Sequence, residues 1–266
     1  MNILIRELKS NYRGLLIWGL ALMLLNIWMV SMFPSFAADG AGLAEMVDMF
    51  PPGMIKVFGL DIMAMDDPLG FYGAEAYFMV VLFGSIYAAI LGSGILAKEQ
   101  DDKTIEFLLA KPVSRLHIIG EKALAWIIYL VLFNLGIGLA TWLSFELFDV
   151  GEFSRTTLFW MLTAPLLVHL VFASLGFFSA LFFTRRKSAL SVSIGLVLGL
   201  YFINTIALLS ENVEFLRWLT PFHYADAADI FSDGALHPGY ALLLLGFALL
   251  LCIVTGAIYR RKNITL

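Results

Sequence analysis

The side chains that could do chemistry inside a membrane are few in this sequence. Catalysis or ion coupling within a hydrocarbon layer needs ionisable groups there, and such groups are costly to place in lipid. Apart from tyrosine phenols and the thiol of Cys252, only His169 lies within a long apolar stretch, and Glu75 lies at the outer edge of another. His169 follows Pro165 by four residues, so we interpret it as a hydrogen-bonded side chain near a proline kink.

Motifs for catalysis and nucleotide binding are missing from the sequence. It contains no H-E-x-x-H zinc motif, no pair of aspartates within the apolar stretches and no paired histidines there for haem. It also lacks the G-x-x-x-x-G-K-[ST] phosphate loop, so it has no Walker site for ATP. These absences argue against an intramembrane enzyme. Asn134, within another apolar stretch, is expected to hydrogen-bond between helices.

The most informative polar segment is the loop over residues 98–122. Asp101 or Asp102 can cap a short helix in this loop. The apolar residues that follow fall on one helix face, at i, i+3 and i+4: Ile105, Leu108 and Leu109. Pro112 disfavours helical geometry in the residue before it and so ends the helix, and Ser114 can cap the next one. The loop therefore predicts a short amphipathic helix at the membrane surface.

The composition decides which class of protein must position these residues. Of 266 residues, 61% are apolar and 14% charged, and the mean hydropathy is +0.88. Soluble domains contain about 45–50% apolar and about 25% charged residues. Too few polar side chains remain to cover a soluble globule, which excludes an ordinary cytosolic enzyme and a disordered chain. A single cysteine excludes an intrachain disulfide. A polytopic membrane protein is the class that remains.

Six uncharged runs are long enough to cross a bilayer, which takes about 20 helical residues. We predict an all-α polytopic membrane protein, one transmembrane domain over residues 1–266. Its spans are approximately 14–33, 76–97, 123–145, 157–184, 188–209 and 239–259. The first span is expected to end near Phe33, before Pro34. It could instead be a cleaved signal peptide, but its apolar run exceeds the usual ~7–15 residues, so we favour a retained helix.

The basic residues predict the orientation of the spans. Fourteen of the 17 Lys and Arg residues lie in the N-terminal segment, the 98–122 loop, the 185–187 turn and the C-terminal segment. The other side holds Lys56, Arg155 and Arg217. Positive residues mark the cytoplasmic face, so both termini and the loop are expected in the cytoplasm, with the protein in the plasma membrane.

The segments between and before the spans also carry expectations. Residues 1–13 predict an amphipathic helix on the inner surface, with apolar residues at helical spacing: Ile3, Leu4, Leu8 and Tyr12. Outside, residues 39–75 predict short interfacial helices broken at residues 51–53, or a loop packed on the helix ends. The external segment 211–238 is too apolar for a solvated loop, so we expect it on the outer leaflet.

Small residues form stripes on three of the predicted spans. On the second span these are Ser85, Ala88, Ala89, Gly92 and Ser93; on the fourth, Ala173, Ser174, Gly176, Ser179 and Ala180; on the fifth, Ser188, Ser191, Gly195 and Gly199. Such stripes let helix backbones approach closely in lipid. We expect contacts within the bundle or, for the fifth span, a seam between two subunits.

The loop also resembles the signature of a known family. Residues 99–115 are similar to the loop of ABC-2 type transporter permeases, roughly E-x-x-x-G-T-x-E-x-L-L-x-x-P-V-S-R followed by a lysine. The matching residues are Glu99, Thr104, Glu106, Leu108, Leu109, Pro112, Val113, Ser114, Arg115 and Lys122. Lys103 stands where the family usually has glycine. Residues 220–222, Thr-Pro-Phe, resemble the family's external Pro-Phe element.

The resemblance implies a half-transporter in the lipid bilayer. Two six-helix permease subunits, alike or different, would form the pathway, each resting on a separately encoded ABC ATPase. The loop helix would be the coupling helix, through Asp102, Lys103, Thr104, Ile105, Glu106, Leu108, Leu109, Pro112 and Arg115. This chain would bind no cofactor and no nucleic acid, since ATP and Mg would bind the ATPase. ATP-driven closure of the ATPases would power alternating access, usually for export.

A standalone secondary transporter or channel is the alternative. Ion coupling would normally require carboxylates or basic residues near the midplane of the membrane. The six runs offer only His169. The mostly apolar pathway admits lipids, peptides, drugs or lipid-linked sugars as substrates.

Overall fold

The long helices account for most of the fold. The computed structural model describes residues 3–38, 49–60, 62–102 and 113–262. In this part of the chain, six helical stretches are long and apolar enough to cross a membrane. They contain α1 (Ile3–Ala37), α5 (Phe78–Asp101), α7 (Arg115–Leu147), α8 (Arg155–Ser179), α9 (Arg186–Leu209) and α11 (Pro238–Arg261). The prediction of an all-α chain with six membrane-length helices is confirmed.

Shorter helices extend or connect the spans. The second span begins with α4 (Pro68–Tyr72) and a π-helical turn, η1 (Gly73–Tyr77), which contains Glu75. The fourth ends in a 3-10 turn, η2 (Ala180–Phe182). The connecting elements are α3 (Pro52–Phe58), η3 (Glu211–Leu219), η4 (His223–Ala225) and α10 (Ala227–Asp233). Pro52 begins α3, as its position within the predicted break at residues 51–53 allows, and the segment 39–48 before it lies outside the described residues.

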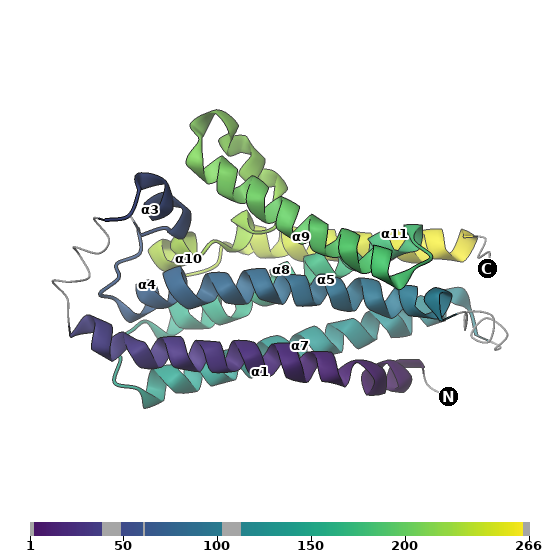
Figure 1. Ribbon diagram of the computed structural model, residues 1–266, viewed down its shortest axis with the longest axis horizontal. Coiled ribbons are helices and arrows are strands. Elements are labelled where there is room, and N and C mark those ends of the chain that lie inside the picture. Colours follow the sequence, from purple (N-terminus) through teal and green to yellow (C-terminus); the bar gives the residue numbers. More distant parts are fainter. Residues whose placement is uncertain (1–2, 39–48, 61, 103–112, 263–266) are drawn as a thin grey trace.

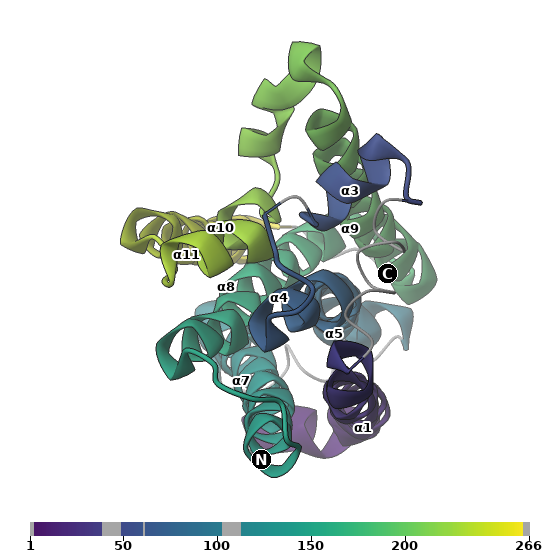
Figure 2. The same ribbon diagram turned by 90° about the vertical axis from the view of Figure 1, so that its left-hand side faces the viewer.

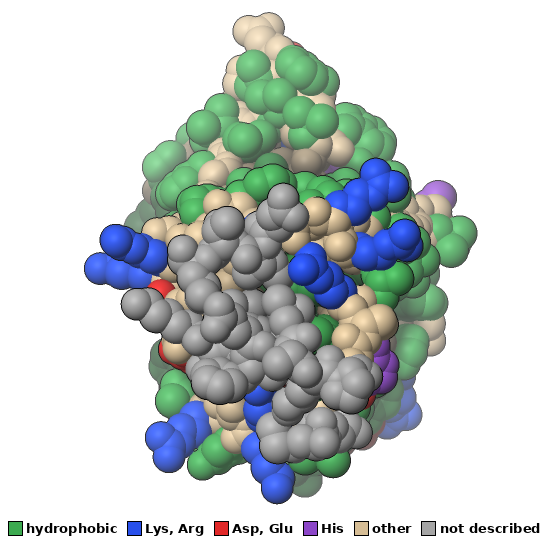
Figure 3. All heavy atoms as spheres, turned by 90° about the vertical axis from the view of Figure 1, so that its right-hand side faces the viewer, with side chains coloured by type: hydrophobic (Ala, Val, Ile, Leu, Met, Phe, Trp, Pro, Cys, Tyr) green, Lys and Arg blue, Asp and Glu red, His purple; other side chains and the backbone are tan. Residues whose placement is uncertain are grey.

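The spans run roughly along one axis (Figure 1). Both termini lie at the same end, where α5 ends and α7 begins, and basic side chains are spaced around this end (Figure 3). We call it the basic end. Viewed from the other end, α5 and α8 occupy the middle, with α1 and α7 on one side and α9 standing apart on another (Figure 2).

The two central helices, α5 and α8, pack backbone against backbone. A Cβ atom added at Gly92 would lie 2.1 Å from the Ala173 carbonyl oxygen, and one added at Gly176 would lie 2.4 Å from that of Ala89. No side chain fits at such distances, so glycine is needed at both crossings. The predicted stripes on the second and fourth spans are therefore close helix contacts.

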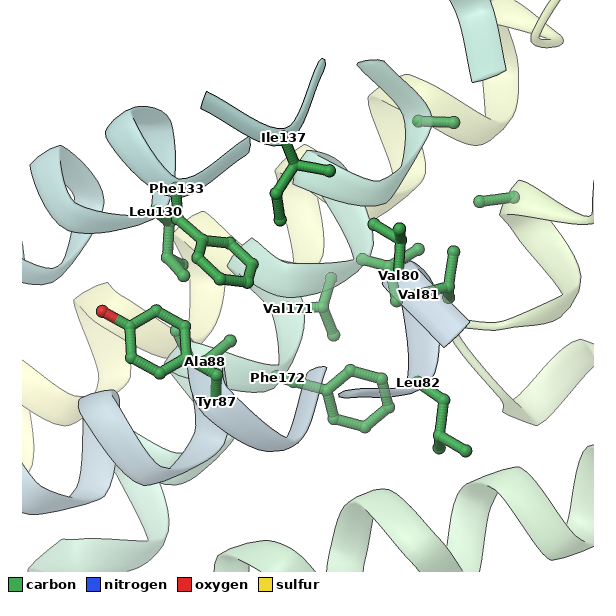
Figure 4. Packing of buried hydrophobic residues seen from close by; sticks show 14 of the residues in the cluster. Val80, Val81, Leu82, Tyr87, Ala88, Leu130, Phe133, Ile137, Val171 and Phe172 are labelled. Atoms are coloured by element: carbon green, nitrogen blue, oxygen red, sulfur yellow. The ribbon is translucent and has the colours of Figure 1, made fainter. Parts of the chain in front are cut away.

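Apolar side chains from α5, α7 and α8 fill the space around this contact (Figure 4). His169 of α8 is fully buried among them. Its Nδ1 lies 3.0 Å from Asn134 Oδ1 on α7, and its Nε2 lies 3.2 Å from the Val80 carbonyl oxygen on α5. Both ring nitrogens thus have partners on neighbouring helices, as the structural interpretation of His169 and Asn134 predicts.

The stripe on α9 differs from the other two. Gly195 and Gly199 are exposed, and an added Cβ at either would have no described atom within 4 Å. The expectation of a contact within the bundle is therefore wrong for these two glycines. The physical reason is that α9 leans away from the centre and leaves most of its surface uncovered in this chain.

The first helix also differs from its expectation. The predicted amphipathic segment is not a separate helix, because α1 runs without interruption from Ile3 and packs along α7. It also continues past Pro34 to Ala37. A proline in the last turn removes only one backbone hydrogen bond. Phe33 and Phe36 pack against Phe71, with ring centroids 5.5 and 5.4 Å away, which favours continuing the helix.

Capping and surface contacts complete the helix ends. Ser114 caps α7 as predicted, because its Oγ accepts a hydrogen bond from the His117 N–H at 3.1 Å. At the end opposite the basic end, Arg155 at the start of α8 pairs with Glu146 near the end of α7 through two contacts of 3.0 and 3.1 Å. In η3, Phe215 and Trp218 are more than half exposed, and a lipid surface would cover such side chains.

Candidate functional site

The predicted coupling residues fall mostly outside the described part of the chain. These are Lys103, Thr104, Ile105, Glu106, Leu108, Leu109 and Pro112, and with them the predicted coupling helix. Asp102 follows the last residue of α5, and its N–H donates to the Lys98 carbonyl oxygen at 2.8 Å. Arg115 opens α7, and its Nη1 donates to the Lys262 carbonyl oxygen at 2.6 Å. Arg115 therefore ties the start of α7 to the end of α11.

A buried group of charged side chains lies where α5 ends and α7 begins. Lys122 of α7 is only 1% exposed. Its ammonium lies 2.7 Å from each carboxylate oxygen of Glu99 on α5 and 3.3 Å from Glu7 Oε1 on α1. It also donates to the Ile95 carbonyl oxygen at 2.5 Å. One lysine thus joins three helices.

The second carboxylate, Glu7, has further partners. It is fully buried, pairs with the ammonium of Lys98 and accepts from Asn11 Nδ2 at 3.3 Å. Arg6, at the edge of the group, reaches Glu99 Oε1 at 2.6 Å. We call Arg6, Glu7, Lys98, Glu99 and Lys122 the ion cluster. It contains two carboxylates and three cations, with the partly exposed Arg6 on its outside.

The ion cluster places strong constraints on the three helices. Removing charges from water is expensive, and their attraction compensates only where the geometry is good and the other hydrogen-bonding positions are occupied. Lys122 meets this condition, since four oxygen atoms surround its ammonium. Loss of one partner from such a group costs about 3–5 kcal/mol, because it leaves an uncompensated buried charge. The cluster therefore favours one relative position of α1, α5 and α7.

The position of the cluster relates it to the predicted coupling segment. Lys98 and Glu99 lie just before residues 103–112, and Lys122 lies in the third turn of the helix after them. Both sides of that segment are consequently fixed to α1 and to each other.

Sequence reasoning recognised part of this cluster. Glu99 and Lys122 both match the loop signature, yet the residues alone did not show that they pair with one another. Glu7 was missed. The available signal was its position, because Glu7 is the one carboxylate within residues 1–13 and lies four residues after Ile3 on the same helix face. A carboxylate on a face otherwise facing the bundle requires a buried cation.

In the described part of the chain, six membrane-length helices with close central packing define a polytopic helical membrane protein. The sequence matches the family described as "ABC-2 family transporter protein" over residues 1–263. The chain therefore belongs to the ABC-2 transporter family, as the resemblance of its loop implied, and it is a multi-pass membrane component of a transporter. No curated protein matches the chain.

Replacing Lys122 by methionine should destabilise the protein strongly. Lys122→Met keeps an unbranched side chain but leaves Glu7 and Glu99 without their shared cation. We expect the free energy of unfolding to fall by about 3–5 kcal/mol and the thermal midpoint to decrease. The midpoint is measured by the intrinsic fluorescence of the purified protein in detergent. Lys187→Met, which removes an exposed lysine from the same end, is the control and should change little. Equal midpoints for the two variants would show that the cluster does not stabilise the bundle.

Proposed function

We propose that this chain is the membrane-spanning subunit of an ABC exporter. Two permease subunits would form the pathway, and a separate ATPase subunit would supply the energy. Family membership supports the transport role. The observation that carries the coupling proposal is the ion cluster, since it gives the loop between α5 and α7 a rigid base at the surface of the bundle.

The proposed mechanism transmits motion from the loop to the central helices. When the ATPases close on ATP, they push the coupling helix predicted within residues 103–112. Because the ion cluster joins α1, α5 and α7, the push moves these helix ends together. The backbone contact at Gly92 and Gly176 carries α8 along with α5. The less buried α9 and α11 then change their positions relative to this unit, which opens and closes the pathway.

In this proposal ATP and Mg bind the partner ATPase, and the chain itself binds no cofactor and no nucleic acid. The lack of a phosphate-loop motif in the sequence supports this division of labour. The basic end is assigned to the cytoplasm of a plasma-membrane protein, because Lys and Arg gather there (Figure 3). This orientation brings the loop to the side where ATP is available.

The orientation can be tested by labelling introduced cysteines in cells. In a Cys252→Ser background, a membrane-impermeant maleimide added outside should label exposed positions Glu152→Cys and Ser232→Cys. It should label Lys187→Cys, exposed at the basic end, only after permeabilisation. Labelling of position 187 in intact cells would reverse the proposed orientation.

The second permease subunit is proposed to pack on α9. Gly195 and Gly199 form a G-x-x-x-G pair that faces away from the rest of the chain. In lipid, such a pair allows another helix to approach closely. No helix of the described chain approaches the pair in this way. The exposed stripe is thus better suited to a seam between subunits than to the bundle.

Gly195→Leu should weaken dimerisation while leaving the fold intact. Overpacking a close contact costs about 1–3 kcal/mol, so we expect a shift from dimer to monomer in native mass spectrometry. The thermal midpoint of the monomer should stay the same, because nothing in the described chain lies against Gly195. The matched control is Gly246→Leu on α11, which also has open space around it. A dimer as abundant for Gly195→Leu as for this control would rule out the proposed seam.

The coupling helix can be tested in the assembled transporter. We expect Glu106→Lys and Leu108→Asp to abolish stimulation of ATP hydrolysis and to reduce recovery of the ATPase in a pull-down, since each places an unfavourable charge at the proposed contact. Membrane insertion should be normal. The control Lys187→Glu reverses a charge at the same end outside the loop and should keep coupling. Unchanged stimulation in both loop variants would mean that the helix only covers lipid headgroups.

A further inference from the structure

A second feature lies at the end of the bundle opposite the basic end. There η4, α10 and the first turn of α11 surround an open cavity of about 330 Å³. Its lining includes the rings of His223, Tyr224 and Tyr240, the carboxylates of Asp226, Asp229 and Asp233, and the guanidinium of Arg217. We call it the α10 pocket. Neither the family match nor the proposed coupling mechanism assigns it a role.

Aromatic rings form one side of the α10 pocket. The centroids of Tyr224 and Tyr240 lie 5.2 Å apart with their planes nearly perpendicular, and His223 lies 5.8 Å from Tyr240. Trp218 packs behind His223 at 4.6 Å. Faces of aromatic rings attract cations through their electric quadrupole. The wall is therefore suited to an alkyl chain that ends in a positively charged group.

His223 lacks the hydrogen bonds that a buried imidazole normally makes. It is 7% exposed, and neither ring nitrogen has a hydrogen-bond partner among the described residues. Burial, and after it the charge of Arg217, lowers the pKa of His223, so the ring is neutral at pH 7. A neutral imidazole has one nitrogen that accepts a hydrogen bond. That nitrogen can accept from a ligand N–H inside the pocket.

Negative charge exceeds positive charge around the pocket. Asp226 is already engaged, since it accepts from Arg217 at 3.2 Å and from the Ala228 N–H at 2.9 Å. Asp229 and Asp233 lie one helical turn apart and form no ion pair within the described part of the chain. Burial and the neighbouring Asp226 raise the pKa of Asp229, which indicates that a cation there would be favoured.

We propose that the α10 pocket binds a primary ammonium group carried by an organic molecule. The ammonium would donate to His223 and pair with Asp229 and Asp233, while its carbon chain packs on Tyr224 and Tyr240. An anion would be repelled by the carboxylates. A metal ion is disfavoured, because no group of three His, Cys, Asp or Glu residues in the described ranges is arranged to hold one. The proposal is independent of the ATPase and of the direction of transport.

Calorimetric titration of the full-length protein in maltoside detergent tests the charge requirement. The probe is butylamine at pH 7, where it is a cation, and butan-1-ol is its neutral counterpart. We expect binding of butylamine at least tenfold tighter than that of butanol. The double variant Asp229→Asn/Asp233→Asn should weaken butylamine binding at least tenfold. Its control, Asp149→Asn/Glu152→Asn, removes two exposed carboxylates from the same end and should bind as the native protein does.

The His223→Phe variant separates a ligand-binding role from a structural one. It keeps a ring of similar shape and removes both nitrogens, so butylamine binding should weaken. Because those nitrogens have no partner within the described chain, the thermal midpoint should not fall. The proposal is overturned by equal binding of butylamine and butanol, or by unchanged binding in the double variant. It is also overturned if His223→Phe lowers the midpoint and leaves binding unchanged.

Two sources of the ammonium group can be distinguished in the same system. If a lipid headgroup occupies the pocket, nanodiscs containing phosphatidylethanolamine should reduce butylamine binding compared with phosphatidylglycerol nanodiscs. If the ligand is a free amine, the two kinds of nanodisc should give the same affinity. Either result supports the ammonium site, and it identifies which class of molecule supplies the group.

Discussion

The contact between Lys122 and the carboxylates of Glu7 and Glu99 is the interaction on which the basic end of the bundle depends. It brings together helices from three parts of the sequence, and the three side chains are almost completely buried. The rest of that end follows from it. Once α1 is fixed to α5 and α7, the helices bordering the loop cannot separate without exposing a charge to an apolar surrounding. Charged contacts fix the relative position of these helix ends more strictly than apolar contacts do, because a displaced charge loses its partner.

A different kind of contact holds the centre. Between α5 and α8 the backbones approach closely at Gly92 and Gly176, so neither helix can rotate about its axis without a steric clash. The His169 bridge to Asn134 and Val80 adds directed bonds between α5, α7 and α8. By contrast, a Cβ atom added at Gly195 or Gly199 of α9 would have no described atom within 4 Å. The molecule therefore combines a closely packed centre with a helix that is mostly uncovered within the described chain.

The spans themselves were predictable from the sequence because lipid leaves few alternatives. A single backbone segment that crosses lipid must be helical, so six uncharged runs of sufficient length predict six helices. The start of α7 was predictable from Ser114 because capping is a local interaction. The end of α1 was not, since the cost of Pro34 was outweighed by contacts with Phe71, which is distant in sequence.

The same distinction applies to the sites. The small-residue stripes showed which helix faces are able to make close contacts, but not which of them have a partner in this chain. The loop signature contained Glu99 and Lys122, while Glu7 became part of the cluster only through tertiary packing. The α10 pocket was invisible in the sequence, because its carboxylates and rings come from segments whose relative positions depend on the whole external end.

The exposure of the charged pairs at the two ends has a consequence for the behaviour of the bundle in salt. Exposed charges are screened over a Debye length of about 8 Å at physiological ionic strength, whereas buried charges are screened much less. Glu146 and Arg155 join α7 to α8 with side chains that are 37% and 68% exposed, but Lys122 and Glu7 are almost completely enclosed. Rising ionic strength thus weakens the Glu146–Arg155 pair more than the contacts between Lys122 and Glu7. These two sets of charges therefore differ in how strongly the surrounding electrolyte affects them: the exposed pair is weakened by salt, and the enclosed contacts are weakened much less.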